Sequence, residues 1–391
     1  MQSRTVQLPA GPCPPEVLRA AAAEGGRPPE LALAFLPPDD ELPGQVALMA
    51  EEWPGSLCFG CEAATQFAGG ERTTNGSVQL FWFDAPPAHG ATIEVVEGTH
   101  AAPPDPERAA ALARRLAAAG GGLLLMDGRR FPAEPFLAEL RRHLLASDAG
   151  RGALSLIAGG LASDRENRPP PTAAAPGARV FCQGRVLPSA CLAVLWSGVE
   201  MRVEVVRGWD AASPIYTVDR AAGNVIHQID GISATGWYRR FFTAGGELAP
   251  MPESAYRFPL IVEGPKPERQ GLYRSMRAFD DPPGAVTFWA SVETGDRVRL
   301  GMGNDVSLVR TASALPAGLR PEAAVLFSCA CRELVLGDGA GREVAAIHQA
   351  LGNAALSGFF TAAEIGPTRR GDLGYYNHTA ILVLLSERRP A

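Results

Sequence analysis

Three polar residues near the C-terminus have the chemistry needed to bind a small zwitterion. Arg332 follows an apolar run, and Glu364 and Asn377 lie in the loop-to-strand region that comes after it. A guanidinium binds a carboxylate through two parallel hydrogen bonds, a carboxylate accepts hydrogen bonds from an ammonium group, and an amide fixes the orientation of the ligand. The three side chains are therefore candidates for a ligand clamp. The alternative is that Arg332 and Glu364 form a structural ion pair and that Asn377 satisfies the backbone of its own loop.

Four of the seven cysteines occur as two close pairs, Cys58 with Cys61 and Cys329 with Cys331. Four thiolates could bind zinc or an iron–sulfur cluster if the two pairs met. Both pairs lie at the ends of apolar strands, where alternate residues face opposite sides, and a free cysteine is a common core residue. We therefore expect reduced structural thiols, without a metal site or a disulfide framework.

The sequence lacks the motifs of well-known enzyme classes. The glycine-rich run 337–341 matches neither the dinucleotide fingerprint nor the Walker pattern, and we expect it to lead into a helix. No G-x-S-x-G or H-E-x-x-H pattern is present. An enzyme acting on a small carboxylate metabolite is kept as an alternative, in which Arg332 or Glu364 would be needed for activity.

Composition and charge limit the range of partners. The chain has 391 residues, a net charge of -6 and 46% hydrophobic residues, as expected of a globular protein large enough for two domains. An acidic chain repels the phosphate backbone, so nucleic acid is not an expected partner. No apolar run reaches the roughly 18 residues of a membrane span, and no signal peptide is recognised. We therefore expect a cytoplasmic protein without membrane insertion.

One pattern of strands, helix and loop occurs three times. In each copy a strand and a helix are followed by a second strand that ends at glycine, then by an irregular loop and another apolar strand. Glycine lets the backbone turn sharply, so the loops should gather at equivalent edges. The glycines are Gly60, Gly159 with Gly160, and Gly358. The elements expected for the three copies are 31–36, 41–52, 57–59 and 75–84; 123–126, 132–146, 154–158 and 190–196; and 324–329, 341–351, 355–358 and 377–385.

These units predict an α/β (α+β) fold of repeated β-α-β-loop-β units, with mixed sheets flanked by helices and two pseudo-similar halves. The expected domains are a flexible N-terminal arm at 1–30, an N-terminal domain at 31–236 and a C-terminal domain at 237–391. A proline-rich segment at 164–178 is expected to be a loop, because proline fixes φ and removes a backbone donor. A helix is expected at 223–229.

Several short motifs occur in a recognisable order along the chain. The C-terminal part contains Phe-Ser-Cys-Ala-Cys-Arg at 327–332, Gly-Phe-Phe-Thr-Ala-Ala-Glu at 358–364 and Asn-His-Thr at 377–379. The N-terminal part contains Gly60-Cys61 and the run Gly-Gly-Leu-Ala-Ser-Asp at 159–164. Together they resemble the N-terminal and C-terminal domains of the FIST family, from about residue 31 onward.

The resemblance implies a bacterial sensory protein that binds a small molecule, such as an amino acid or a related metabolite, and signals through a separate partner such as a histidine kinase. It adds Thr361, Cys61 and Asp164, at the glycine-terminated turns, to the expected ligand-binding residues. No cofactor is predicted. Some proteins of the family bind haem and sense nitric oxide, which keeps a haem sensor as an alternative, with His378 or His348 as the first candidates to bind the iron.

Overall fold

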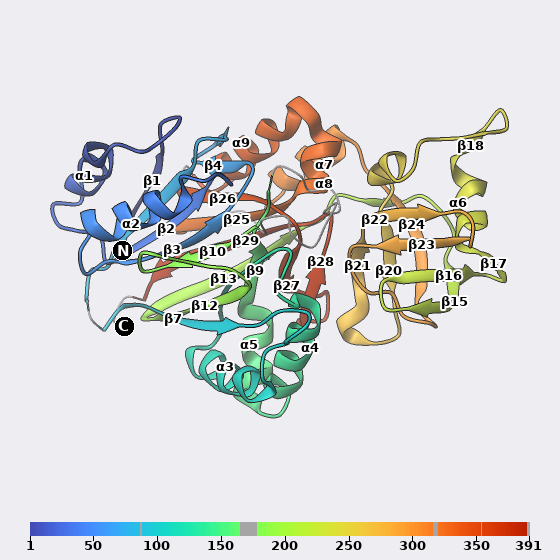
Figure 1. Cartoon of the computed structure of the whole chain (residues 1–391), viewed down its shortest axis with the longest axis horizontal. Helices are drawn as coiled ribbons and strands as arrows, with labels where there is room; N and C mark the ends of the chain where they lie inside the picture. The colour runs from blue at the N-terminus through green and yellow to red at the C-terminus, as the bar shows by residue number, and fades with distance from the viewer. Residues whose placement is uncertain (87, 165–177, 316–319, 353, 389–391) are drawn as a thin grey trace.

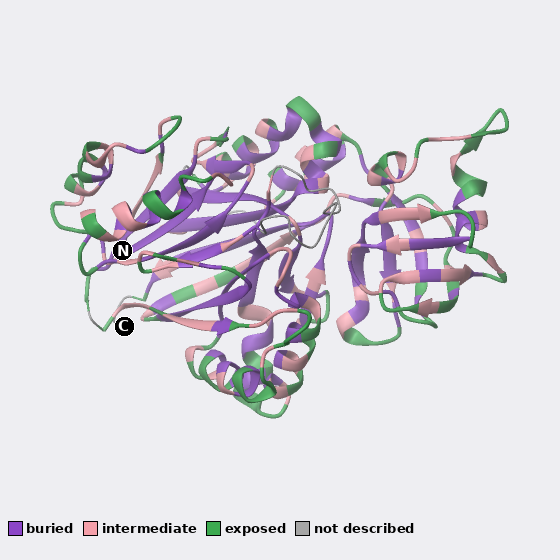
Figure 2. Ribbon diagram, in the orientation of Figure 1, coloured by how far each residue is buried: buried purple, intermediate pink, exposed green. Residues whose placement is uncertain are grey.

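Three six-stranded sheets form the larger body of the protein, and a smaller β-rich lobe lies beside them (Figure 1). The structure is a computed structural model that describes residues 1–86, 88–164, 178–315, 320–352 and 354–388. The central strands of the larger body are buried (Figure 2). The mixed sheets and flanking helices predicted from the sequence are confirmed.

Each sheet of the larger body contains six hydrogen-bonded strands. In order, the first contains β1 (Gln2–Gln7), β6 (Ser77–Trp82), β2 (Leu31–Leu36), β3 (Leu57–Glu62), β10 (Val180–Cys182) and β11 (Arg185–Leu187). The second contains β7 (Gly90–Glu97), β12 (Ala190–Ser197), β8 (Gly122–Met126), β9 (Ile157–Leu161), β27 (Glu364–Pro367) and β28 (Leu373–Tyr376). The third contains β13 (Val199–Val206), β29 (Ala380–Glu387), β25 (Ala323–Cys329), β26 (Ala355–Thr361), β4 (Gln66–Ala68) and β5 (Glu71–Thr73).

The three sheets share one arrangement of strands. Each has a parallel pair from one β-α-β unit, and a later strand of that unit (β6, β12 or β29) pairs antiparallel with the first strand of the pair. A hairpin from a different unit completes the sheet. The hairpin β4–β5 joins the third sheet, β10–β11 the first and β27–β28 the second. The predicted repeat is confirmed. The three β-α-β units have the same strand arrangement, and each contributes a hairpin to the sheet of another unit.

A glycine occupies the same place in each parallel pair. It lies opposite a residue whose carbonyl oxygen would be only 1.7 to 1.9 Å from an added Cβ atom. Because no side chain can be accommodated at that distance, the close approach of the two strands requires glycine. The three pairs are Gly60 with Ala34, Gly159 with Leu124, and Gly358 with Leu326.

Helices cover the outer faces of the sheets, and the inner faces share one core (Figure 1). The rings of Phe35, Phe327 and Phe359 meet in this core, with centroids 4.8 to 6.5 Å apart. The helices are α1 (Pro15–Ala23) and α2 (Leu42–Glu52) on the first sheet; α3 (Pro106–Ala119), α4 (Ala133–Leu144) and α5 (Asp148–Ala153) on the second; and α8 (Ala330–Leu336) and α9 (Ala340–Ala350), with α7 (Asp305–Ser313), on the third.

The β-lobe (residues 207–302) is inserted between β13 and β25. Its strands are β21 (Gln270–Arg274), β20 (Leu260–Glu263), β24 (Arg297–Met302), β15 (Tyr216–Ala222), β16 (Val225–Ile229), β23 (Ala285–Phe288) and β22 (Met276–Asp280) in order, with β14 (Asp210–Ala211) beside β24 and β17 (Ile232–Ser233) beside β16. It also holds α6 (Ala234–Phe242) and the small hairpin of β18 (Thr243–Ala244) and β19 (Glu247–Leu248). Short 3-10 segments are η1 (Leu154–Leu156), η2 (Glu253–Arg257), η3 (Pro267–Arg269) and η4 (Gly337–Gly339). The domain boundary expected between residues 236 and 237 falls inside the β-lobe, because strands before and after it belong to the same lobe sheet.

The N-terminal residues do not form the flexible arm expected at 1–30. The strand β1 pairs with β6 along six residues, and α1 follows it. The Met1 ammonium forms ion pairs with Asp84 at 3.0 Å and with Glu387 at 2.6 Å. Backbone pairing and these charges hold the segment against the first sheet.

Two other expectations concern the middle of the chain. The helix expected at 223–229 is wrong, because Val225 and Ile226 belong to β16 and pair with β23. Most of the proline-rich segment, residues 165–177, lies outside the described residues. Within the described residues, no helix combines the length and apolar character that crossing a membrane requires.

Candidate functional site

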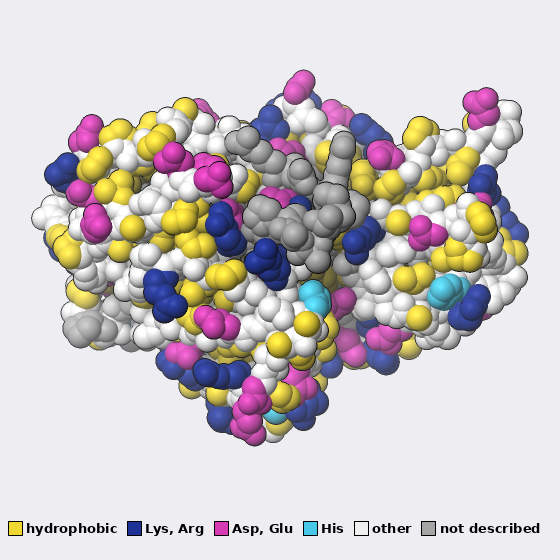
Figure 3. Space-filling model, viewed as in Figure 1, with side chains coloured by type: hydrophobic (Ala, Val, Ile, Leu, Met, Phe, Trp, Pro, Cys, Tyr) yellow, Lys and Arg dark blue, Asp and Glu magenta, His cyan; other side chains and the backbone are white. Residues whose placement is uncertain are grey.

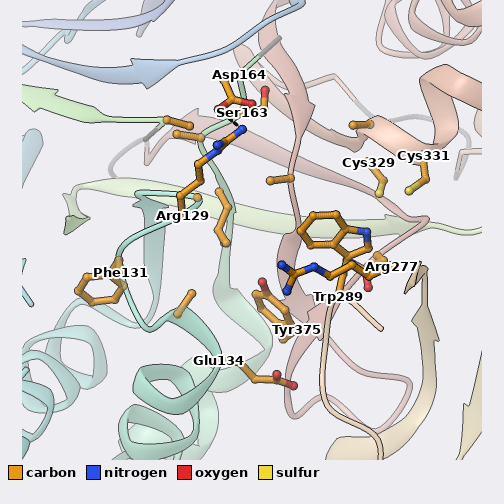
Figure 4. A pocket seen from close by; sticks show the side chains of 18 of the residues that line it. Arg129, Phe131, Glu134, Ser163, Asp164, Arg277, Trp289, Cys329, Cys331 and Tyr375 are labelled. Atoms are coloured by element: carbon orange, nitrogen blue, oxygen red, sulfur yellow. Dashed lines mark ion pairs between the residues drawn. The ribbon is translucent and has the colours of Figure 1, made fainter. Parts of the chain in front are cut away.

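A pocket of about 300 Å³ lies where the β-lobe meets the carboxyl ends of β8, β9 and β25. Basic and acidic side chains lie along the boundary between the larger body and the β-lobe (Figure 3). Arg129 and Phe131 reach the pocket from the larger body, and Arg277 and Trp289 reach it from the lobe (Figure 4). A concave site between two bodies, with apolar walls and a few polar groups, is the usual form of a small-molecule site.

The turn after β8 positions the wall on the side of the larger body. Buried Asp127 accepts hydrogen bonds from the backbone N–H groups of Arg129, at 2.8 Å, and Arg130, at 2.6 Å, which fixes the turn. The Arg129 guanidinium forms an ion pair with Asp164 at 2.6 Å, and its Nη1 has no hydrogen-bond partner within the described part of the chain. The Arg129 charge is therefore balanced, but one of its donors is free.

The wall on the side of the β-lobe carries a cation without an acidic partner. The Arg277 guanidinium lies over the Trp289 ring, 5.1 Å from its centroid, which is a cation–π contact. No described residue forms an ion pair or a hydrogen bond with Arg277. Stacking on the indole holds the guanidinium plane while its N–H groups stay available.

Glu134, at the start of α4, connects the two bodies at the edge of the pocket. Its carboxylate accepts hydrogen bonds from the backbone N–H of Ser291, at 3.0 Å, and from the Ser291 hydroxyl, at 2.6 Å. The guanidinium of Arg274 lies 3.8 Å away. This is a charge-assisted contact between the larger body and the lobe.

Two more donors come from the end of β28. Asn377 is only 1% exposed, and its Oδ1 accepts a hydrogen bond from the backbone N–H of Ser275 at 3.3 Å. Its Nδ2 and the Tyr375 hydroxyl have no hydrogen-bond partner among the residues that are described, although both side chains line the pocket. Burial raises the pKa of Tyr375, so its hydroxyl stays protonated at neutral pH. With Arg277, they make a set of unused donors that suits an anionic oxygen ligand.

The structure places only two of the predicted ligand-binding residues, Asn377 and Asp164, in the wall of this pocket. Arg332 is fully buried and forms an ion pair with Glu343. It also donates a hydrogen bond to the His378 carbonyl at 3.3 Å. Arg332 therefore forms a structural ion pair, but its partner is Glu343 and not the expected Glu364. The clamp of Arg332, Glu364 and Asn377 does not open onto the pocket.

Glu364 and Thr361 belong to a buried polar cluster beside the same segment. The Glu364 carboxylate accepts hydrogen bonds from the Thr361 hydroxyl at 2.6 Å and from the backbone N–H of Thr379 at 3.1 Å. Burial raises the pKa of Glu364 well above its ordinary value. Cys61 is also fully buried, in the core shared by the three sheets. None of these three side chains lines the pocket, because each points into the interior.

The two cysteine pairs do not meet as a metal site. Cys58 packs toward α2, whereas Cys61 faces the shared core, as alternate residues of a strand do. No group of three or more metal-binding side chains occurs in the portion of the chain that is described. Cys329 and Cys331 both line the pocket.

The histidines do not fit the haem alternative at the expected positions. His378 is fully buried, and its desolvation, together with the nearby Arg332 charge, lowers its pKa to about 3. Both of its ring nitrogens lack a hydrogen-bond partner in the described residues, and its ring packs against Trp209. His348, on α9, lies against the turn at Gly70. Neither lines the pocket, whereas His100 does.

Sequence reasoning missed Arg277, Trp289, Glu134 and Arg129, all of which line the pocket. Arg277 and Trp289 come from the β-lobe, where the sequence shows only short strands and turns. Glu134 and Arg129 flank the strand-ending turn at Asp127 and Gly128, which is visible in the sequence as a strand end. Only that turn offered a signal, because ligand residues often follow the carboxyl ends of strands.

Comparison with known proteins identifies the family of this chain. The model of the FIST N domain matches residues 30–232, and that of the FIST C domain matches residues 234–367. A search of the curated proteins finds no match. The two matches follow each other along the chain and cover most of it, including both sides of the pocket. The chain therefore belongs to the FIST family, whose domains are associated with the sensing of small ligands in signal transduction.

Proposed function

We propose that this protein senses a small carboxylate-bearing metabolite of the amino-acid class in the pocket between the larger body and the β-lobe. The observation that carries the proposal is the convergence of unused donors on one pocket, from Arg277 of the β-lobe and from Tyr375 and Asn377 of the larger body. Buried or half-buried donors without partners are costly, and a bound carboxylate would satisfy them. Family membership supports a sensory role.

The other groups of the pocket suit the remainder of such a ligand. The Glu134 carboxylate lines the pocket and has lone pairs left for an ammonium group after its bonds to Ser291. Phe131, Leu161 and Trp289 supply apolar wall for a side chain. The guanidinium, carboxylate and amide that the sequence suggested thus recur here, but Arg277 and Glu134 take the places assigned to Arg332 and Glu364.

We further propose that the protein passes its signal to a separate partner, such as a histidine kinase, and that both act in the cytoplasm. A ligand that contacts Arg277 and Asn377 touches both bodies at once. It would therefore stabilise one relative position of the β-lobe, which is how ligands commonly shift a two-body equilibrium. A change in the position of the β-lobe would alter the contact between Glu134 and Ser291, and this contact would pass the change to the larger body.

The first prediction concerns the unpaired guanidinium. Replacing Arg277→Gln should weaken binding of a stabilising amino acid about ten- to hundredfold, because a charge-assisted hydrogen bond is worth about 1.5–3 kcal/mol. Binding is measured by calorimetry after a thermal-shift screen of the amino acids, since a ligand selective for the folded state raises the melting temperature.

Arg239→Gln is the matched control, because Arg239 also lies over a lobe aromatic ring, Phe279, at 5.8 Å, but outside the pocket. It should leave binding unchanged. The ligand is also varied, by comparing the amino acid with its decarboxylated amine and with its deaminated acid. Equal binding of the amine would contradict the assignment of the carboxylate to Arg277, and a chain stabilised by no amino acid or carboxylate would refute the proposed function.

A further inference from the structure

Cys329 and Cys331 are the only two cysteines that share a wall of the pocket, all seven being described. Cys329 ends β25, and Cys331 lies in the first turn of α8. One intervening residue separates them, and, in addition to burial, the interaction with Cys331 contributes to the raised pKa of Cys329. In Figure 4 the two sulfur atoms lie side by side at the same edge of the pocket.

The two thiols differ in their access. Cys329 is 1% exposed, whereas Cys331 is half-buried and reaches the pocket. The Cys331 Sγ lies 3.2 Å from the Ser275 hydroxyl of the β-lobe. Burial raises the pKa of Cys329 well above its ordinary value, so the accessible Cys331 is the thiol that meets a reagent first.

We infer that Cys329 and Cys331 form a thiol–disulfide redox site in the wall of the pocket, oxidised by low-molecular-weight disulfides. The Cys331 thiolate attacks one sulfur of the external disulfide, which forms a mixed disulfide and releases one external thiolate. The Cys329 thiol then gives its proton to the released external thiolate and attacks the Cys331 sulfur, which closes the internal disulfide and releases the second external thiolate. Two electrons pass to the external disulfide, and the two protons lost by the cysteines are taken up by the released thiolates.

A disulfide across a single intervening residue closes a small ring at the junction of β25 and α8. Strained or accessible disulfides have more oxidising potentials than structural ones and are therefore readily reduced again. Closure also removes the thiol that contacts Ser275, whose backbone N–H holds the Asn377 amide. Oxidation should therefore alter the wall of the pocket around Ser275 and Asn377, whether or not the proposed ligand is correct.

The test equilibrates the whole protein in buffers of reduced and oxidised glutathione, traps free thiols by alkylation and analyses the tryptic peptide that ends at Arg332. We expect this peptide to escape alkylation at both cysteines and to lose the mass of two hydrogens as the buffer becomes more oxidising. Hydrogen exchange of the segments containing Ser275 and Asn377 should change over the same range. Cys331→Ser should abolish the internal disulfide.

Cys182→Ser is the control, because Cys182 is also half-buried but lies outside this pocket; it should leave the transition unchanged. The wild-type titration needs no variant, so it stays informative if Cys331→Ser fails to fold. Free thiols at both positions across the whole range, or Cys331 held as a glutathione mixed disulfide with Cys329 reduced, would overturn the inference.

Discussion

At the scale of single residues, the guanidinium of Arg332 is occupied by the protein itself. It is fully buried, pairs with Glu343 and donates hydrogen bonds to the carbonyl groups of Arg207 and His378. These contacts connect α8, α9, the start of the β-lobe and the segment next to Asn377. Arg332 therefore stabilises the structure next to the pocket without lining it.

The second prediction concerns this ion pair. Arg332→Met should lower the free energy of unfolding by about 3–5 kcal/mol, because it leaves the Glu343 charge buried and unpaired. The double variant with Glu343→Leu should recover much of that loss. Both values come from urea unfolding. If Arg332→Met lowered the free energy of unfolding by less than about 1 kcal/mol, the ion pair would have to be accessible to water.

For the candidate site, the sequence indicated residue types that also occur in the pocket, but it placed most of them at other positions. Arginine, a carboxylate and an asparagine amide were expected, and Asn377 and Asp164 do line the pocket. Arg332 and Glu364 were misplaced because the side chains that point inward at a strand end look the same in a sequence as those that point into a pocket. Arg277 could not be found, because nothing local shows that the β-lobe folds back against α4.

At the scale of elements, the three glycines of the parallel pairs are steric requirements of the sheets. The sequence revealed these glycines, but it placed them at the ends of their strands, whereas each lies within its strand, β3, β9 or β26. The main strands and helices of the three units were likewise predicted. The segment 223–229 was not, since a short apolar run fits a helix or a strand equally well until its pairing partner is known.

The third prediction concerns Gly159, whose added Cβ would lie 1.9 Å from the Leu124 carbonyl oxygen. Gly159→Ala should destabilise the protein by about 1–3 kcal/mol or more, because the parallel strands must move apart. Gly341→Ala is the control, since nothing lies within 4 Å of its added Cβ and it is in α9. That change should be neutral or stabilise the protein by up to about 1 kcal/mol. Equal melting temperatures for the two variants would contradict the steric argument.

At the scale of the whole molecule, a charge cluster joins the two ends of the described chain. Glu387 of β29 receives the Met1 ammonium at 2.6 Å and a hydrogen bond from the backbone N–H of Asp84 at 3.0 Å. Burial opposes ionisation of Glu387, but these bonds and one with His89 outweigh it and lower its pKa to about 2. The cluster fastens the first sheet to the third.

The fourth prediction follows from that pKa. The Glu387 pKa is lower in the folded state, so its contribution is complete above the ordinary value of 4.5 and is lost as the pH falls from 4.5 toward about 2. We expect about 1–2 kcal/mol from this group after screening near the surface. Urea unfolding of the wild type and of Glu387→Gln at several pH values should show a difference that shrinks below pH 4.5. If the difference in unfolding free energy between the two proteins did not change with pH, the effect of Glu387 would come from packing and not from its charge.

The exchange of hairpins determines how the chain can be divided. The third sheet takes β4, β5 and β13 from the region matched by the FIST N domain, and it takes β25 and β26 from the region matched by the FIST C domain. A cut between the two regions would leave incomplete sheets with open edges on both fragments, and open edges invite aggregation. The two matched regions are thus separate in sequence but inseparable in folding, so neither is expected to be inherited, expressed or transplanted as a working module without the other.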